Sequence, residues 1–227
     1  MGLHPYCIAP SDHAPGAVTG LGGAPVIAVP GSDLAAWASE LPEPAAASIE
    51  AVRTHDAVIR AAMTERVTPV PLRFGQWAAD RAVLLERLAE HAARWHERLR
   101  EFAGAVEMGI RLTPAAPAPA AAPPAGRARA ASGREYMAQL AARVHDRDAL
   151  EREHARLLER IGESLGDVAF RTASGVAPDD GRTLWVAHLV RLGRADEYRR
   201  LADRIAQQET GYRTAVTGPW PPYSFGS

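Results

Sequence analysis

The sequence DVAFRTASGVAPDDGRTLWVAHLV, residues 167–190, predicts two consecutive strands joined by a turn. Residues 167–172 and 183–190 are rich in valine, phenylalanine, threonine and tryptophan, which favour strands. Between them, residues 174–181 contain the glycine, proline and aspartate that favour turns. Because the connection is too short to contain a helix, these two strands follow each other directly in the C-terminal half of the chain.

Helices and further strands flank this pair on both sides. Residues 106–112 predict a strand and residues 134–165 a helix, while residues 196–208 predict a second helix and residues 212–217 a last strand. In the long helix, the side chains expected to face inward are Leu140, Val144, Leu150, Leu157 and Ile161. The order β-α-β-β-α-β is that of a ferredoxin-like domain. The Pro/Ala-rich residues 113–132 then form a long loop between its first strand and first helix.

The N-terminal half predicts a separate α+β unit. Its expected elements are strands at 4–9 and 25–29, helices at 33–40, 45–66 and 80–104, and an extended segment at 67–74. Ser32 and Asp33 offer an N-cap for the first of these helices, and Asp80 offers one for the last. Pro69 and Pro71 deny helical bonding to the extended segment and confine it to a sheet edge or a bulge.

The predicted fold class is therefore α+β with two domains. An N-terminal α+β domain covers residues 1–104, and a ferredoxin-like (βαββαβ) domain covers residues 105–217. Residues 218–227 form a C-terminal tail rich in proline and aromatic side chains.

Charge and composition exclude several functions. All 26 basic residues are arginine, so a P-loop lysine, a Schiff-base lysine and a pyridoxal-phosphate anchor are impossible. The formal net charge is −1, and the arginines alternate with acidic residues along helices, so we expect no nucleic-acid partner. Cys7 is the single cysteine, no apolar run is long enough to cross a membrane and the first basic residue is Arg53, so we expect a cytoplasmic protein with no membrane association.

Catalytic and metal sites are not predicted. His145, Asp148 and Glu151 lie three residues apart on one helix face, as metal ligands could, but their mixed-charge surroundings favour a solvated face. His91 and His96 are five residues apart and therefore lie on different faces of their helix. We expect no metal, no cofactor and no catalytic residue, and hence no enzyme.

Three features stand out as candidate contact sites. His55 lies on the apolar side of its helix, where we favour a core histidine bonded to a backbone carbonyl over a catalyst. Arg73 interrupts the apolar extended segment PVPLRFG, where it faces water on an edge strand or contacts a partner. The C-terminal GPWPPYSF favours polyproline II, which suits packing on the protein's own surface or in a partner's groove.

Taken together, these stretches resemble the gas vesicle protein F/L family (GvpF/GvpL). The resemblance runs through HPYCIAP, THDAVIRAAM, VTPVPLRFG and TGPWPPYSF, and so extends from near the N-terminus almost to the end. Residues matching the family's typical positions are His55, Arg73, Phe74, Gly75, Gly218, Pro219, Trp220, Pro221, Pro222, Tyr223 and Phe225. The resemblance implies one domain of novel topology and one modified ferredoxin-like domain.

The resemblance also implies a function. Members of that family are accessory or minor structural components of gas vesicles that contact the major shell protein and take part in early assembly, and they are not known as enzymes. The implied partners are the major gas vesicle shell protein and other gas vesicle accessory proteins. Two alternatives from other classes are a small-ligand-binding regulatory protein built on a ferredoxin-like domain and a metal-dependent enzyme using His145 and its acidic neighbours.

Overall fold

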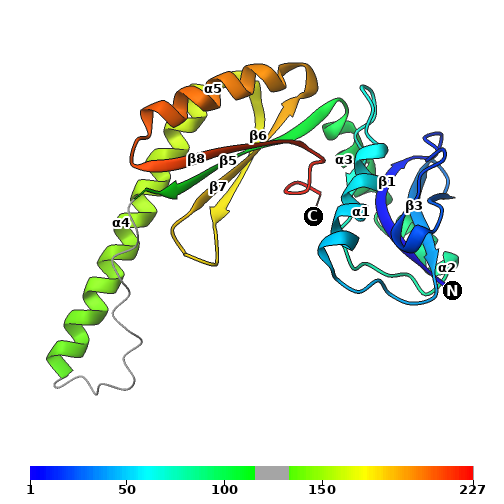
Figure 1. The fold of residues 1–227 in the computed structure, drawn as a ribbon, viewed down its shortest axis with the longest axis horizontal. Coiled ribbons are helices and arrows are strands. Elements are labelled where there is room, and N and C mark those ends of the chain that lie inside the picture. The colour runs from blue at the N-terminus through cyan, green and yellow to red at the C-terminus, as the bar shows by residue number, and fades with distance from the viewer. Residues whose placement is uncertain (116–132, 227) are drawn as a thin grey trace. The chain divides into compact units, whose positions relative to one another are not determined.

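The computed structural model describes residues 1–115 and 133–226 of the 227-residue chain. Contacts between residues divide the chain into two compact units. Unit 1 contains Met1–Met108, His188–Ala195 and Gly218–Ser227, and unit 2 contains Gly109–Ala187 and Asp196–Thr217 (Figure 1). The predicted domain boundaries after residues 104 and 217 stay predictions, since β5, β7 and β8 each contribute residues to both units.

A four-stranded sheet with the order β2-β3-β1-β4 forms the framework of unit 1. Its strands are β1 (Gly2–Pro10), β2 (Ile27–Pro30), β3 (Leu34–Leu41) and β4 (Val70–Pro71). The central strand β1 runs antiparallel to both β3 and β4, and Cys7 lies opposite Trp37. The register shifts between Pro5 and Cys7, where Pro5 has no N–H to contribute to the ladder. Every residue of β1 except Pro10 is buried, so its near-continuous apolar sequence matches a strand covered on both faces.

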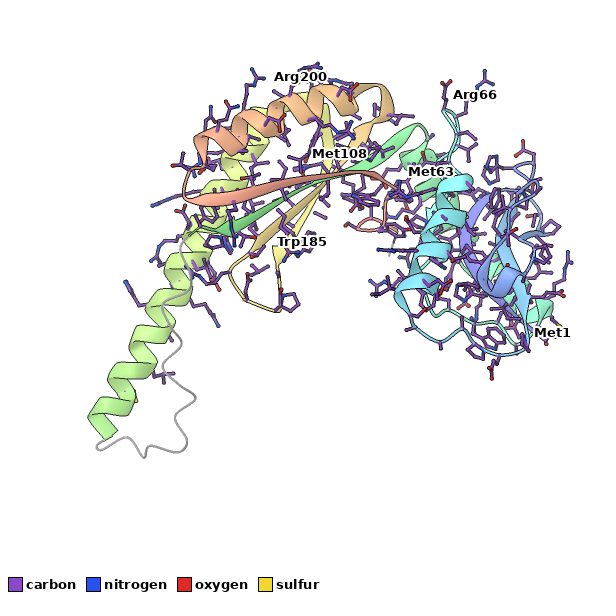
Figure 2. The ribbon with its side chains drawn as sticks, viewed as in Figure 1. Met1, Met63, Arg66, Met108, Trp185 and Arg200 are labelled. Carbon is purple, nitrogen blue, oxygen red and sulfur yellow. The ribbon has the colours of Figure 1, made fainter. Side chains whose placement is uncertain are left out.

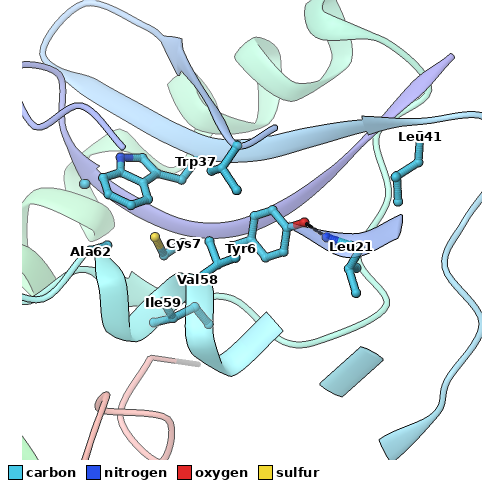
Figure 3. Close-up of a cluster of buried hydrophobic side chains, with 10 residues drawn as sticks. Tyr6, Cys7, Leu21, Trp37, Leu41, Val58, Ile59 and Ala62 are labelled. Atoms are coloured by element: carbon cyan, nitrogen blue, oxygen red, sulfur yellow. Dashed lines mark hydrogen bonds between the residues drawn. The ribbon is translucent and has the colours of Figure 1, made fainter. Parts of the chain in front are cut away.

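Helix α1 (Ile49–Ala61) packs its apolar side into this framework. The helix begins where the Ser48 side chain accepts a hydrogen bond from the Ala51 N–H. Its buried residues are His55, Val58 and Ile59. Val58 and Ile59 join Tyr6, Cys7 and Trp37 in one core cluster (Figure 3). Burial in this cluster raises the pKa of the Cys7 thiol, so Cys7 is a neutral core residue.

The hydroxyl of Tyr6 links three segments inside the core. It accepts a hydrogen bond from the Leu21 N–H at 2.9 Å, drawn as a dashed line in Figure 3, and donates one to Ser39 Oγ at 3.0 Å. Ser39 in turn donates to the carbonyl of Pro25 at 3.0 Å. Residues 20–26, which include the short 3₁₀ helix η1 (Leu21–Gly23), are thereby fixed against the sheet.

The helix expected at residues 33–40 is wrong, because this segment is strand β3. Its alanines suit a helix locally, yet all of its residues except Glu40 are buried between β1 and β2. The Ser32 hydroxyl donates to Asp33 Oδ1 instead of capping a helix. Pairing on both sides outweighs the weak local preference.

The expected helix at residues 80–104 is present as two helices, α2 (Arg81–Glu90) and α3 (Ala92–Phe102). Asp80 is the N-cap, as predicted, and its side chain accepts from the Val83 N–H at 2.9 Å. The chain leaves helical geometry at His91, where φ is −107° and ψ is 14°. The bend lets Leu84 and Leu88 of α2 and Phe102 of α3 all be buried.

Unit 2 draws on the elements predicted from residues 167–190 and their surroundings. In chain order they are β5 (Ala105–Pro114), α4 (Gly133–Leu165), η2 (Gly166–Val168), β6 (Ala169–Val176), β7 (Leu184–Arg191), α5 (Ala195–Gln208) and β8 (Tyr212–Trp220). The short 3₁₀ helix η3 (Leu192–Arg194), between β7 and α5, belongs to unit 1. The strands form a sheet in the order β6-β7-β5-β8. In β7 the indole of Trp185 lies against Gly175 of β6 (Figure 2). The chain is thus a mixed α/β protein with two antiparallel sheets.

Helix α4 is longer than the sheet on which it packs. Its 33 residues span about 50 Å at 1.5 Å per residue, whereas the ten residues of β5 span about 33 Å. Leu157 and Ile161 in the C-terminal half are fully buried, as expected. Leu140 and Val144 are 43% and 51% exposed, so the prediction that they face inward is wrong. The N-terminal half of α4 extends past the strands in Figure 1.

Two further predictions concern the Pro/Ala-rich loop and membrane-spanning segments. Most of the predicted loop 113–132 lies outside the described residues. None of the helices in the described ranges is long and apolar enough to span a membrane.

The Tyr6 hydroxyl provides a test of the core of unit 1. In Tyr6→Phe the Leu21 N–H loses its acceptor and Ser39 Oγ loses a donor, so we expect a loss of about 1–3 kcal/mol in the free energy of unfolding. Tyr212→Phe is the matched control, because Tyr212 is half-buried at the start of β8. Urea unfolding followed by circular dichroism measures both. Equal effects of the two substitutions would contradict the assigned role.

Candidate functional site

The C-terminal segment, residues 218–226, packs on unit 1. Gly218, Pro219 and Trp220 end strand β8, so the last strand is three residues longer than predicted. Pro221, Pro222 and Phe225 are buried, while Trp220 and Tyr223 stay 39% and 37% exposed. Gly218 has a φ of +103°, and a Cβ there would lie 2.6 Å from the Glu107 carbonyl oxygen. Only glycine permits this close approach of the segment to β5.

Helix α1 holds the segment through an ion pair between Asp56 and Arg60. Asp56 Oδ2 accepts a hydrogen bond from Arg60 Nε at 2.7 Å. The Arg60 guanidinium also donates to the Pro219 carbonyl at 3.2 Å and lies 4.3 Å from the centroid of the Trp220 ring. The other carboxylate oxygen of Asp56 accepts from the Tyr223 hydroxyl at 2.7 Å. Burial, and then this bond to Asp56, raise the pKa of Tyr223, so the phenol remains a donor.

Glu107 of β5 holds the segment at a second point. Its Oε2 accepts from the Ser224 N–H at 2.7 Å and its Oε1 accepts from the Ser224 hydroxyl at 2.8 Å. Burial raises the pKa of Glu107, and the two bonds from Ser224 oppose this by favouring the charged form. We call Asp56, Arg60 and Glu107 the tail-docking site.

His55 lies in a chain of buried hydrogen bonds that reaches residues 71–75, the PLRFG segment. Its Nε2 lies 2.9 Å from the Leu72 carbonyl oxygen, so Nε2 must carry the proton and donate. Its Nδ1 is then the acceptor for Nε2–H of His4, at 2.9 Å. The prediction of a core histidine bonded to a backbone carbonyl is confirmed. His4 Nδ1 has no hydrogen-bond partner in the described structure.

Both histidines are neutral in the folded protein. Burial, and then the repulsion that a proton on His55 would exert, lower the pKa of His4 to about 4 from its ordinary 6.5. Burial also lowers the pKa of His55, although the bond to the Leu72 carbonyl acts in the opposite direction. A proton on His4 would place a charge in a site that is 1% exposed.

Phe74 and Gly75 complete the turn that follows β4. The Phe74 ring lies 5.4 Å from the ring of His4 and 5.6 Å from that of His55, centroid to centroid. Gly75 has a φ of +88°, which suits glycine and lets the chain turn directly after Phe74. Arg73 precedes them and is exposed.

A groove on unit 1 runs from this turn across α2 and α3. It consists of two adjoining cavities of about 240 Å³ and 310 Å³, which share Leu72, Gln76, Arg94 and Trp95. The first cavity continues along Ile8, Leu84, Arg87, Leu88 and His91. The second continues along Pro71, Arg73, Tyr223 and Gly226. We call the whole the arginine groove.

The structure thus brings together segments that the sequence could only name separately. The PLRFG segment and the C-terminal segment line one groove, and His55 fixes the backbone of the PLRFG segment at Leu72. Sequence reasoning missed Asp56, Arg60, Glu107 and His4. Asp56 and Arg60 are spaced i,i+4, a pattern usually found on solvated helix faces. No pattern links Glu107 with Ser224, which is 117 residues away.

The structure also places the residues that were considered as metal ligands or catalysts. Within residues 1–115 and 133–226, no group of three or more His, Cys, Asp or Glu side chains is placed to hold a metal ion. His145 is exposed on the N-terminal half of α4. The hydrogen bonds that surround His55 hold backbone in place and leave it no nucleophile to activate.

Comparison with known proteins identifies the family. The family model for gas vesicle synthesis protein GvpL/GvpF matches residues 2–227. Gas vesicle protein L of Streptomyces sp. (strain CB03234) is 32% identical over 189 residues, covering 78% of this chain and 68% of that protein. Gas vesicle protein F of the same organism is 29% identical over 242 residues, covering 99% of each. The chain belongs to the GvpL/GvpF family of gas vesicle proteins, which is not a known enzyme family.

Solved structures confirm the mixed α/β fold with two antiparallel sheets. The crystal structure of gas vesicle protein GvpF from Anabaena sp. PCC7120 covers 100% of this chain with a TM-score of 0.76 at 19% identity. The structure of GvpF from Microcystis aeruginosa gives a TM-score of 0.75 at 19% identity, with 100% of this chain and 99% of that one covered. The match of the family model over residues 2–227 confirms the resemblance to the gas vesicle protein F/L family.

The buried histidines predict a loss of stability in acid. The unfolded chain protonates His4 near pH 6.5 and the folded chain only near pH 4, so the unfolded state binds more protons between these values. The free energy of unfolding should therefore fall as the pH is lowered through this window, by roughly 3 kcal/mol for His4. His188, whose pKa burial also lowers to about 4, adds to the loss.

The variant His4→Gln separates the contribution of His4. A glutamine amide can still donate to His55 Nδ1 but does not titrate. Urea unfolding at pH 7 and pH 4.5 should show a smaller difference for the variant than for the wild type. An unchanged difference would show that His4 does not contribute to the acid sensitivity.

The tail-docking site predicts local opening when Glu107 is altered. Glu107→Gln replaces one acceptor of the Ser224 bonds by an amide that donates, so we expect amide exchange at Ser224 and Phe225 to rise about tenfold or more. The exposed Glu86 of α2 provides the control Glu86→Gln, which removes the same charge. Hydrogen exchange followed by mass spectrometry of the C-terminal peptide measures the exchange rate in both variants. Equal protection in both variants would contradict the docking.

Proposed function

We propose that this protein is an accessory or minor structural protein of gas vesicles that binds the major shell protein and assists early assembly, in part by preventing its aggregation. Other gas vesicle accessory proteins are further proposed partners, and the cytoplasm with its gas vesicles is the proposed location. The proposal rests on membership of the GvpL/GvpF family over residues 2–227.

One structural observation supports a binding role. The two segments that the sequence marks as contact candidates, PLRFG and the C-terminal segment, line one groove although they lie about 150 residues apart. This groove presents the half-buried Trp95 beside the exposed Arg73 and Arg94. A wall that excludes liquid water needs a subunit with a strongly apolar face, which aggregates unless it is covered. A groove with apolar and charged parts can bind apolar side chains of such a face while its arginines stay hydrated.

The finer architecture is also a proposal. We assign residues 1–104 to an N-terminal α+β domain, residues 105–217 to a modified ferredoxin-like domain and residues 218–227 to a tail. The element order β5-α4-β6-β7-α5-β8 and the sheet order β6-β7-β5-β8 support the ferredoxin-like assignment.

Aggregation of the shell subunit provides the test. Purified shell subunit diluted from denaturant should scatter light more slowly when equimolar protein is present, and the two should co-elute in size exclusion. Trp95→Ala removes an apolar wall of the groove and should weaken this effect severalfold. Trp185→Ala on β7 removes a tryptophan that is 37% exposed outside the groove and should preserve it. Unchanged scattering, together with no co-elution, would reject the proposal.

A further inference from the structure

The arginine groove has an apolar floor and cationic walls. Ile8, Leu72, Leu84 and Leu88, which are 3–7% exposed, line the floor, and the half-buried Trp95 forms an apolar wall. Arg73, Arg87 and Arg94 contribute guanidinium groups, and none of the described lining residues of either cavity is a carboxylate. On a chain whose formal net charge is −1, this lining is locally cationic. A ligand that complements it is anionic at its sides and apolar at its centre.

Two of the arginines are held in place while keeping donors available. Arg87 uses one N–H to donate to the Trp77 carbonyl at 2.8 Å, which leaves the other donors of its guanidinium. The Arg94 guanidinium lies 5.5 Å from the Trp95 ring centroid, and Arg94 is exposed. His91 is a weaker candidate, because Glu90 Oε2 lies 3.9 Å from its Nε2. The arginines are therefore the groups that would pair with a carboxylate.

The backbone of β4 is poorly suited to recognition of a ligand by strand addition. An added strand needs free N–H and C=O groups along a sheet edge. In β4 and the residue after it, Pro71 has no N–H, the Leu72 N–H donates to the Tyr6 carbonyl at 2.8 Å, and the Leu72 carbonyl accepts from His55. With these groups already used, β4 offers few backbone groups to an added strand, so we expect recognition mainly by side chains.

We propose that the arginine groove binds a short peptide segment in which acidic residues flank a bulky apolar side chain. The carboxylates pair with Arg87 and Arg94, and the apolar side chain lies against Trp95, above the floor formed by Leu72, Leu84 and Leu88. Cavities of this size accommodate one or two side chains rather than a whole helix. The inference goes beyond the proposed function, because it concerns the chemistry of the bound segment and not the protein that contains it.

Fluorescence polarisation of the full chain with a labelled peptide tests the inference without shell protein. The probe has glutamates on both sides of two leucines, and it should bind with an affinity that falls as salt is raised. Replacing its glutamates by glutamine, or its leucines by serine, should weaken binding at least tenfold. Equal binding of the glutamine peptide, or equally tight binding of an oligothymidine, would overturn the proposal.

Substitutions in the protein locate the binding. Arg94→Glu should weaken binding of the glutamate peptide at least tenfold and Arg94→Gln by a smaller factor, while thermal unfolding shows that both variants are folded. Arg81→Glu makes the same charge change at an exposed residue of α2 outside the groove and should have no effect. Equal weakening by Arg81→Glu and Arg94→Glu would mean that the peptide is attracted by overall charge, and it would contradict binding in the arginine groove.

Discussion

The hydrogen bond from His55 Nε2 to the Leu72 carbonyl fixes the surface on which the candidate site depends. It attaches α1 to the chain directly after β4, and the bond from His4 to His55 extends the connection to β1. Leu72 lines both cavities of the arginine groove, and Arg73 follows it. These two bonds require each histidine to be neutral and in one tautomer, and they leave His4 Nδ1 without a partner in the described structure. The position of the groove wall is thus tied to the protonation state of two core side chains.

The C-terminal segment depends on the same helix. Asp56 follows His55 directly in α1, so the residue that faces the core and the residue that accepts from Tyr223 are neighbours. Proline at positions 219, 221 and 222 limits the conformations of the unfolded segment, which lowers the entropy lost when it docks. The segment therefore acts as part of unit 1, and Tyr223 and Gly226 form a wall of the groove.

Local chemistry in the sequence predicted some of these features and could not predict others. The Asp80 cap, the apolar side of α1 with His55, and the alternation of strands and helices after residue 105 all depend on neighbours in the chain. The strand β3 was missed because its alanine-rich sequence favours a helix until β1 and β2 pair with it. The outward position of Leu140 and Val144 depends on the length of the sheet, which a periodic pattern does not contain. Glu107 and Ser224 meet only through the fold.

The proposed function requires that the protein itself resist edge-to-edge association. Three of the four edge strands contain a proline, namely Pro30 in β2, Pro71 in β4 and Pro219 in β8, and the fourth, β6, contains Arg171. Proline removes an N–H from a sheet edge, and an edge charge opposes pairing. If the edges are closed to added strands, contact with a partner must use side-chain surfaces. The arginine groove offers such a surface, since it combines apolar area with charge that keeps the uncomplexed protein in solution.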